Sequence, residues 1–406
     1  MTKNPANDRL LYTVYFIYFF CGMAMCFEGA FMPEFKEHFQ LTYQQQMYTM
    51  FAKNIPFVVF SILIGLLSKK IGFKNCMTFG MFFFAAGTAL LIPGLNSGNY
   101  SIVLIAFFVI GIGFNFELVA GNPLLSGLGD ASGSSSRLNL GNALGAIAQI
   151  IAPLIILIIL PASVIRVSDK IPYMNGLFLV IAVILVITGG FTLIIRGGEI
   201  NFEGSKNNQK GKSDSNESIL KNKNLLLGFV AIFIALGAEA GIFGLYRNYL
   251  EDPSVGALSS HQSYLLFTIY FATFAIGRLV GAYVQKFIKP AVTLIYSVSV
   301  ALLLLLIMMT SKGLPAIISI TLLGFFISIF FPTLYAISIG GLGKNTPIAS
   351  GLLTMGFLGS ALLPVLQGKI ADCLGLKFSF IISFITYVYV LYFAVRNGTK
   401  IFENNC

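Results

Sequence analysis

The chain has 406 residues, of which 56% are hydrophobic and only 10% are charged. A water-soluble protein of this size has too little interior to bury so many apolar side chains, so the composition excludes that class and indicates an integral membrane protein. The net charge of +10 comes from basic residues in short segments between apolar runs. This distribution is typical of membrane topology and argues against nucleic-acid binding. The five cysteines show neither metal-ligand spacing nor a disulfide framework.

Twelve apolar segments follow one another along the chain. Each is about 20 residues long, which is enough to cross a bilayer as an α-helix. The sequence therefore predicts an all-α membrane protein with twelve transmembrane helices. The predicted spans are residues 10–32, 46–68, 76–94, 100–125, 137–160, 174–196, 225–246, 262–285, 290–310, 314–337, 347–369 and 378–395.

A polar segment interrupts this pattern after the sixth predicted span. Residues 197–224 are rich in Lys, Asn and Ser, a composition typical of a disordered linker. We therefore predict an N-terminal six-helix bundle over residues 1–196, a cytoplasmic linker, and a C-terminal six-helix bundle over residues 225–406. Weak repeats at corresponding places in the two halves support this plan, which in transporters places the substrate site between the halves near mid-membrane.

Lysine and arginine are distributed unequally between the two sides that this order of spans defines. With the N-terminus inside, 17 of them fall on the cytoplasmic side and seven on the opposite side. Cytoplasmic loops of membrane proteins carry the excess of basic residues. We therefore expect both termini in the cytoplasm and the protein in a cell (inner) membrane.

The loop after the second predicted span carries glycines and basic residues at regular spacing. Gly65, Lys70, Gly72 and Lys74 fit the loop motif Gly-x-x-x-Asp-basic-x-Gly-basic-basic, although Lys69 stands where the motif has Asp. Together with twelve spans and a basic central linker, this pattern resembles the major facilitator superfamily. The resemblance implies two pseudo-symmetric six-helix bundles, the major facilitator fold, and a conformational latch that includes Lys70 and Lys74.

Several short motifs resemble the fucose:proton symporter (fucose-permease-like) family more closely. The similarity covers nearly the whole chain, and its most specific part is the Asn-Pro dipeptide followed by Arg-Leu-Asn-Leu. It implies proton-coupled transport of a sugar or polyol. The motifs are Met32-Pro33-Glu34-Phe35, Gly121-Asn122-Pro123, Arg137-Leu138-Asn139-Leu140, Ile276-Gly277-Arg278 and Phe331-Pro332-Thr333.

The acidic positions of the family pattern are displaced by one residue in this chain. Counted back from the Met-Pro-Glu-Phe and Asn-Pro motifs, the family's acids would fall at Gly29 and Leu118, whereas this chain has Glu28 and Glu117. One residue turns a side chain by about 100° on an α-helix. Either the comparison slips by one residue, or the acids face a differently shaped cavity.

Five ionisable residues lie within predicted spans, where a charge costs about 2.5–3.5 kcal/mol on insertion scales. Glu28 and Glu117 are candidate proton carriers, because burial disfavours the charged form of a carboxylate and so permits reversible protonation. The alternative for each is a structural ion pair or hydrogen bond. Arg278, at the end of the eighth predicted span, is a candidate member of the conformational latch.

Lys53 is the most unusual of these intramembrane residues. It is expected either to pair with Glu28 or Glu239, or to recognise an anionic substrate or a substrate oxygen. Glu239 is in turn either a counter-charge or an acceptor for substrate hydroxyl or ammonium protons. Span directions place these three residues at similar depth in the outer half of the membrane.

Neutral polar side chains within the spans are further candidates for substrate binding. Asn142 and Gln149 lie seven residues apart, on one face of a helix. Asn122-Pro123 predicts a break in the fourth span, either to free backbone carbonyls for a cavity or as a simple helix end. The predicted substrate-binding set is Lys53, Asn54, Asn115, Asn122, Asn142, Gln149 and Glu239.

These observations predict a proton-coupled symporter that imports a small polar metabolite by alternating access, with a sugar or polyol favoured by the resemblance. The alternative is a symporter for an amino acid or an organic anion recognised through Lys53. A membrane enzyme would need a clustered His, Cys or Asp site, and the sequence has none. We expect no cofactor beyond the proton gradient, no metal, no nucleic acid, and a monomer whose partners are the substrate, protons and the lipid bilayer.

Overall fold

The computed structural model describes residues 5–129, 134–195, 222–340, 342 and 346–403. Within these ranges, twelve helices are long and apolar enough to cross a membrane, which confirms the predicted number of spans. Large apolar side chains such as Ile158, Ile194 and Leu279 lie exposed on these helices. Exposed apolar surface on this scale is unfavourable in water and is expected where helices face lipid. The chain is a multi-pass membrane protein.

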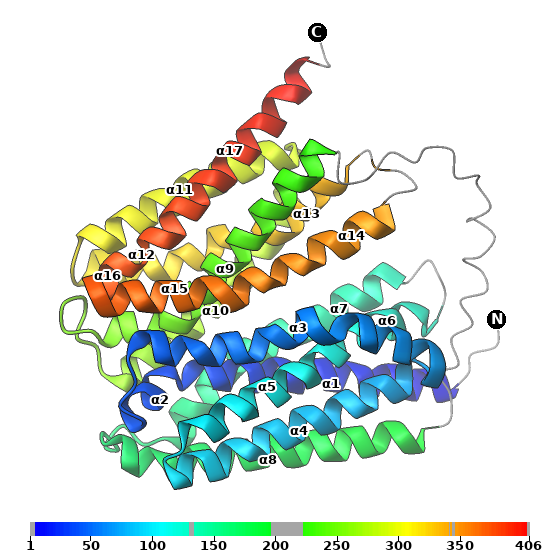
Figure 1. The fold of residues 1–406 in the computed structure, drawn as a ribbon, viewed down its shortest axis with the longest axis vertical. Helices are drawn as coiled ribbons and strands as arrows, with labels where there is room; N and C mark the ends of the chain where they lie inside the picture. Colours follow the sequence, from blue (N-terminus) through cyan, green and yellow to red (C-terminus); the bar gives the residue numbers. More distant parts are fainter. Residues whose placement is uncertain (1–4, 130–133, 196–221, 341, 343–345, 404–406) are drawn as a thin grey trace. The chain divides into compact units, whose positions relative to one another are not determined.

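The secondary structure of the described residues is helical throughout (Figure 1). The first half of the chain contains α1 (Pro5–Ala30), α2 (Met32–His38), α3 (Tyr43–Ile71), α4 (Phe73–Ser97), α5 (Tyr100–Phe116), η1 (Glu117–Gly121), α6 (Asn122–Gly127), α7 (Ser134–Ile159) and α8 (Val167–Ile194). The second half contains α9 (Lys223–Glu251), α10 (Ser260–Val284), α11 (Pro290–Thr310), α12 (Leu314–Ile327), α13 (Phe330–Ile339), α14 (Thr346–Thr354), η6 (Met355–Phe357), α15 (Leu358–Leu374), α16 (Leu376–Ser379) and α17 (Ile381–Glu403).

The fourth span is a continuous helical path made of three segments. Helix α5 runs into the π-helical turn η1 and then into α6, so the span continues through Asn122-Pro123 to Gly127. The predicted break at this dipeptide is therefore wrong. Pro123 lacks an amide hydrogen, and the wider i→i+5 bonding of a π-turn lets the helix pass the proline without ending.

The chain divides into two compact units. One comprises Met1–Cys26, Ile55–Gln149 and Ile171–Ser218, and the other comprises Phe27–Asn54, Ile150–Lys170 and Ile219–Cys406. The second unit thus holds the second half of the chain together with two segments of the first half. The predicted bundles, residues 1–196 and 225–406, remain a prediction. Most of the predicted linker, through residue 221, lies outside the described residues.

Each unit has its own helix packing. In the first unit, α4 packs along α5. In the second unit, α9 is central and packs against α10, α13, α15 and α17, and Figure 1 shows it beside α15. Helix α9 buries Arg247 and Asn248 together with its apolar residues. A buried arginine in an apolar helix requires partners, and these belong to the site described below.

The end of the spans nearest α2, here named the α2 end, contains a contact between α15 and α3. Asp372 of α15 accepts hydrogen bonds from the backbone amides of Tyr43 (2.6 Å) and Gln44 (2.9 Å), at the start of α3. Such amides have no partner within their own helix, and a carboxylate there also interacts favourably with the helix dipole. Gly368, one turn before Asp372, permits this approach, because a side chain at that position would collide with the backbone of Tyr43 and Gln44.

Candidate functional site

Lys53 of α3 and Glu28 of α1 form a buried ion pair. The Lys53 Nζ lies 3.6 Å from Glu28 Oε2, and the two side chains are 5% and 1% exposed. This separation is slightly longer than a hydrogen bond. Within the described residues, neither oxygen of Glu28 has a hydrogen-bond partner. The expected pairing of Lys53 with an acid is confirmed, and the acid is Glu28.

Phe243 of α9 lies against this pair. Its ring centroid is 5.9 Å from Lys53 Nζ, within the range of a cation–π interaction. The ring occupies the space that a side chain at Gly29 would need, so the glycine allows α9 to approach the end of α1. Lys53 therefore has a carboxylate and an aromatic face as neighbours.

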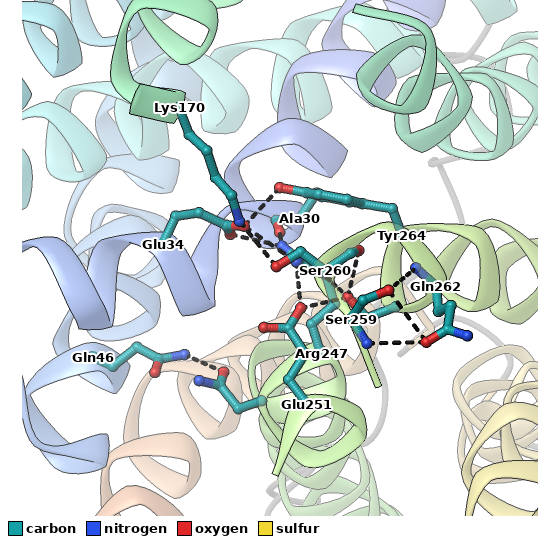
Figure 2. A network of polar contacts seen from close by, with 12 residues as sticks. Ala30, Glu34, Gln46, Lys170, Arg247, Glu251, Ser259, Ser260, Gln262 and Tyr264 are labelled. Carbon is teal, nitrogen blue, oxygen red and sulfur yellow. Dashed lines mark hydrogen bonds and ion pairs between the residues drawn. The ribbon is translucent and has the colours of Figure 1, made fainter. Parts of the chain in front are cut away.

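A second group of buried charges surrounds Glu34 of α2 (Figure 2). Its carboxylate accepts hydrogen bonds from Arg247 Nη1 (2.7 Å) and Nη2 (3.2 Å), from Lys170 Nζ (3.1 Å) and from the hydroxyl of Tyr264 (3.0 Å). Glu251 pairs with Arg247 four residues earlier on α9. These five residues are named the α2 network below. They join α2 to the ends of α8, α9 and α10.

The charge state of Glu34 follows from these neighbours. Burial alone would raise the pKa of its carboxyl group, but the adjacent Arg247 and Lys170 outweigh burial and lower the pKa to about 2. Glu34 is therefore ionised at every pH the protein meets in ordinary conditions. A carboxylate held in this way is a fixed anion and not a proton carrier.

The α2 network cannot be recognised from the sequence alone. There Lys170 and Arg247 count only as charges of the segments that connect spans, and Glu34 only as part of a motif. One local signal was present, since Arg247 and Glu251 stand four residues apart and so face each other on a helix. The pairing of Glu34 with two cations gives no such local signal.

Glu117 opens the π-turn η1 and has a different environment. It is 3% exposed, and Cys21 of α1 lies close to its carboxylate. Its Oε2 has no hydrogen-bond partner among the described residues, and none of the ion pairs found there includes Glu117. A buried carboxylate with no cation beside it is stable only if it can take up a proton.

Two predicted substrate ligands of the first unit are engaged in contacts within the protein. Asn115 is fully buried; it donates to the carbonyl of Pro56 (2.9 Å) and accepts from the hydroxyl of Ser61 (2.9 Å). Asn122 accepts a hydrogen bond from the Tyr18 hydroxyl (2.8 Å). Asn115 thus satisfies a helix carbonyl, whereas no hydrogen bond from the Asn122 amide group is found among the described residues.

Three further predicted ligands lie on two helices, Asn54 on α3 and both Asn142 and Gln149 on α7. Asn54 on α3 and Asn142 on α7 each donate to the carbonyl four residues earlier, at 2.8 and 2.9 Å. Asn142 is exposed and Gln149 is half-buried. The backbone carbonyl of Gln149 accepts from the Cys26 thiol at 3.3 Å. Their substrate-binding role stays a prediction.

The remaining predicted residues have other neighbours than the Glu28–Lys53 pair. Glu239 on α9 is half-buried and lies within electrostatic range of Arg278 on α10. Arg278 Nε donates to the carbonyl of Ser328 at 3.3 Å. Lys74 donates to the carbonyl that follows α8 at 2.8 Å, and Lys70 is exposed. The proposed latch of Lys70, Lys74 and Arg278 remains a prediction.

The chemistry of these groups is that of binding and proton exchange. Among the described residues, no group of three or more His, Cys, Asp or Glu side chains is arranged to hold a metal ion. Buried acids and a buried lysine within twelve apolar helices are typical of transport pathways. A family model described as Major Facilitator Superfamily matches residues 14–337. The chain belongs to the major facilitator superfamily. As a member of this superfamily it is a transporter and not an enzyme.

Relatives within the superfamily cover nearly the full length of the chain. The glucose/galactose transporter of Brucella abortus biovar 1 (strain 9-941) is 28% identical over 406 residues, 97% of each chain. The putative glucose/galactose transporter of Helicobacter pylori (strain J99) is 26% identical, over 99% of this chain and 100% of the relative. The L-fucose-proton symporter of Escherichia coli (strain K12) is 25% identical, over 88% and 86%. These relatives agree with the resemblance stated from the motifs.

Solved structures show the same fold. The major facilitator transporter FucP in the outward conformation gives a TM-score of 0.66 at 21% identity, over 97% of this chain and 99% of that one. A bacterial homolog to human Spinster, in an inward-facing and occupied conformation, gives 0.80 at 11% identity, over 98% of both. The major facilitator fold expected from the sequence is confirmed.

Proposed function

We propose that this superfamily member is a proton-coupled symporter that imports a sugar by alternating access. The observation that carries the proposal is the Glu28–Lys53 pair, a buried acid and base that attract each other at 3.6 Å while both Glu28 oxygens stay without a hydrogen-bond partner among the described residues. The names of the relatives, two glucose/galactose transporters and an L-fucose-proton symporter, support the substrate class.

The pair fits a hydroxyl-rich, uncharged substrate. A sugar hydroxyl is both a donor and an acceptor, so one hydroxyl can donate to a Glu28 oxygen while it or a neighbour accepts from Lys53. Because the carboxylate neutralises the ammonium, the pair has no net charge to favour an anion. The half-buried ring of Phe243 adds an apolar surface for the faces of a sugar ring, as ligand sites combine apolar walls with a few polar groups.

Proton coupling is assigned to Glu117 and Glu28. In the proposal, Glu117 takes up a proton when its side of the pathway faces outside and releases it when the pathway faces the cytoplasm. It has no ion-pair partner among the described residues. The protonated, neutral form of Glu117 is therefore the less costly one while the pathway is closed to both sides. The basic-residue distribution supports an orientation with the α2 end outside and both termini in the cytoplasm.

One observation favours a second candidate function. Lys53 is a buried ammonium, and such a group can recognise the carboxylate of an amino acid or organic acid. This alternative requires that the substrate displaces Glu28 from Lys53, or that Glu28 is protonated when the substrate binds. The two candidates make opposite predictions for the charge of the substrate.

The test is uptake by purified protein in proteoliposomes that contain a pH-sensitive dye. Glucose, galactose, fucose, a neutral amino acid and a dicarboxylate are added separately under an inward proton gradient. We expect one of the sugars to accumulate and to acidify the lumen, with no signal from protein-free liposomes. Glu37→Gln, a change at an exposed glutamate of α2, is the matched control and should behave as wild type. Accumulation of the dicarboxylate or amino acid, without any sugar, would establish the alternative.

A further inference from the structure

Four residues of α9 form one stripe. Glu239, Phe243, Arg247 and Glu251 follow one another at intervals of four residues, so their side chains lie above one another on one face of the helix. Two of them contact the end of α1. Phe243 occupies the space beside Gly29, and one turn later Arg247 donates a hydrogen bond to the carbonyl of Ala30, the last residue of α1.

Arg247 has a partner for every hydrogen it can donate. Nε donates to Ser263 Oγ (2.9 Å), Nη1 donates to Ala30 and Glu34, and Nη2 donates to Glu34 and Glu251. These contacts use all five guanidinium N–H groups. The guanidinium also lies 3.6 Å from the ring centroid of Tyr264. A lysine offers three donors without the planar fork, so it cannot reproduce this set.

These contacts act on the segment that carries Glu28. Ala30 lies two residues after Glu28, and Glu34 lies one turn beyond Ala30. Glu28 and Glu34 are each 1% exposed, so neither is in contact with solvent while Arg247 holds both Ala30 and Glu34. The stripe therefore holds the two residues that follow Glu28, with Phe243 against Gly29 and Arg247 bonded to Ala30.

Solvent reaches the edge of the α2 network but not its centre. A cavity of about 480 Å³ is lined by Lys170, Glu251 and Tyr264 among other residues, and the side chain of Glu251 is 22% exposed. Water that enters by this cavity meets the outer members of the network first. It would reach Ala30 and Glu34 only if the guanidinium of Arg247 moved away.

We propose that Arg247 is a positioning residue for transport: its hold on Ala30 and Glu34 closes the α2 end over Glu28, and its release opens Glu28 to that end. The inference rests on the proposed transport function, because closure has a purpose only if Glu28 must be reached from one side at a time. Arg247 need not touch the substrate. It determines from which side of the membrane solvent and protons can reach Glu28.

The native thiols provide a test that needs no substrate. Cys26 lies on α1 one turn before Ala30 and is 1% exposed, whereas Cys373 is exposed at the α2 end. A membrane-impermeant maleimide is added separately to whole cells and to inverted vesicles, and labelled peptides are resolved by mass spectrometry. The side on which Cys373 reacts marks the α2 end. The rate at Cys26 relative to Cys373 on that side measures closure.

We expect Arg247→Lys to accelerate Cys26 labelling about tenfold or more, since it removes the bidentate contact with Glu34. Tyr264→Phe, which removes one hydroxyl donor to Glu34, should give about a fivefold rise and keeps the fold accessible to measurement if the arginine variant is unstable. A change that only loosened the fold would also accelerate the labelling of Cys76, a buried thiol of α4, so a rise confined to Cys26 identifies opening of the α2 end.

Unchanged ratios in both folded variants would overturn the inference. Because labelling is read without substrate, such a result is independent of the uptake panel. An uptake panel that fails for every sugar would instead overturn the proposed substrate and leave the labelling result standing.

Discussion

Glu34 and Glu28 are both 1% exposed and both lie beside cations, yet their surroundings differ. Glu34 accepts four hydrogen bonds from Arg247, Lys170 and Tyr264. Glu28 faces a single ammonium at 3.6 Å and has no hydrogen-bond partner among the described residues. Glu117 has no ion-pair partner there at all.

The difference separates two uses of buried charge. A fully hydrogen-bonded carboxylate has nothing further to gain from a ligand or a proton, so it fixes structure. Buried carboxylates are nearly always hydrogen-bonded, so one whose oxygens lack a partner is expected to bind a ligand or a proton. The α2 network belongs to the first kind, and Glu28 and Glu117 belong to the second.

The largest effect is expected for Glu117, the buried acid that has no ion-pair partner among the described residues. Glu117→Gln should leave exchange of labelled substrate near the wild-type rate but abolish accumulation driven by a pH gradient, because an amide cannot release a proton. Both quantities are measured in the same proteoliposomes, with Glu37→Gln as the control that should retain both. If Glu117→Gln still concentrates substrate, the proton is carried elsewhere, and Glu28 becomes the first candidate.

The same substitution at Glu34 should act on stability instead. Glu34→Gln leaves the buried charges of Arg247 and Lys170 without their counter-charge, which costs about 3–5 kcal/mol in the free energy of unfolding. Glu117→Gln should change it by only about 1 kcal/mol. Thermal unfolding in detergent, followed by the exposure of buried thiols, measures both. Equal losses in the two variants would remove the distinction between the two kinds of acid.

The pH dependence of stability sharpens this comparison. The pKa of Glu34 is about 2 in the folded protein and near its ordinary 4.5 in the unfolded chain, so the unfolded state binds the proton more tightly. The resulting stabilisation is fully present above the unfolded pKa and is lost as pH falls through the folded pKa. A shift of this size corresponds to about 3 kcal/mol.

We therefore expect the unfolding temperature of wild type to fall as the pH is lowered from the ordinary carboxyl pKa toward the folded one. Glu37→Gln should follow the same curve, because the exposed side chain contributes no comparable pairing. In Glu34→Gln this part of the fall should be missing. A wild-type curve that superimposes on that of Glu34→Gln would contradict the assignment of the acid sensitivity to Glu34.

A double-mutant cycle tests whether Lys53 balances a charge or binds an anion. Lys53→Met and Glu28→Gln should each reduce substrate exchange, and the double variant should recover part of it, with a coupling of about 0.5–3 kcal/mol. Lys53→Met with Glu239→Gln is the matched control. It should show no recovery, because the ion pair is formed with Glu28. Failure of the Lys53/Glu28 double variant to recover, with the protein folded, would favour an anionic substrate.

The smallest effect is expected at the contact between α15 and α3. Asp372→Asn removes the charge that accepts from the amides of Tyr43 and Gln44, while the amide oxygen of asparagine can still cap a helix. The loss should be no more than about 1 kcal/mol in the free energy of unfolding. Asp372→Ala should cost more than Asp372→Asn. The opposite order would show that the aspartate does not act as a cap.

The number of spans could be predicted from the sequence because length and apolarity are local properties of each segment. The pairing of Lys53 with an acid could be predicted for a similar reason, since few charges exist in the apolar spans and an unpaired one is costly. The α2 network could not be predicted. Its partners are 136 and 213 residues apart in sequence, and their positions at helix ends are equally compatible with hydrated loop charges.

The continuation of the fourth span through Asn122-Pro123 was missed for a different reason. A proline after a polar residue usually ends an α-helix, and sequence patterns count α-helical turns. The π-turn η1 is an exception of only five residues. Whether a π-turn forms depends on packing against the neighbouring helices, and the local sequence does not predict that packing.

That π-turn has a consequence for the displaced acid. On a regular α-helix, residues four apart lie above one another, whereas in a π-turn the repeat is about five residues. Glu117 opens η1 and Asn122 follows it, so the two share a face although five positions separate them. The extra residue is absorbed within the turn, so the one-residue displacement of Glu117 from the counted position Leu118 need not turn its side chain away from the face of Asn122. In this segment the direction of a side chain is therefore set by the number of helical turns from Asn122 and not by the number of residues.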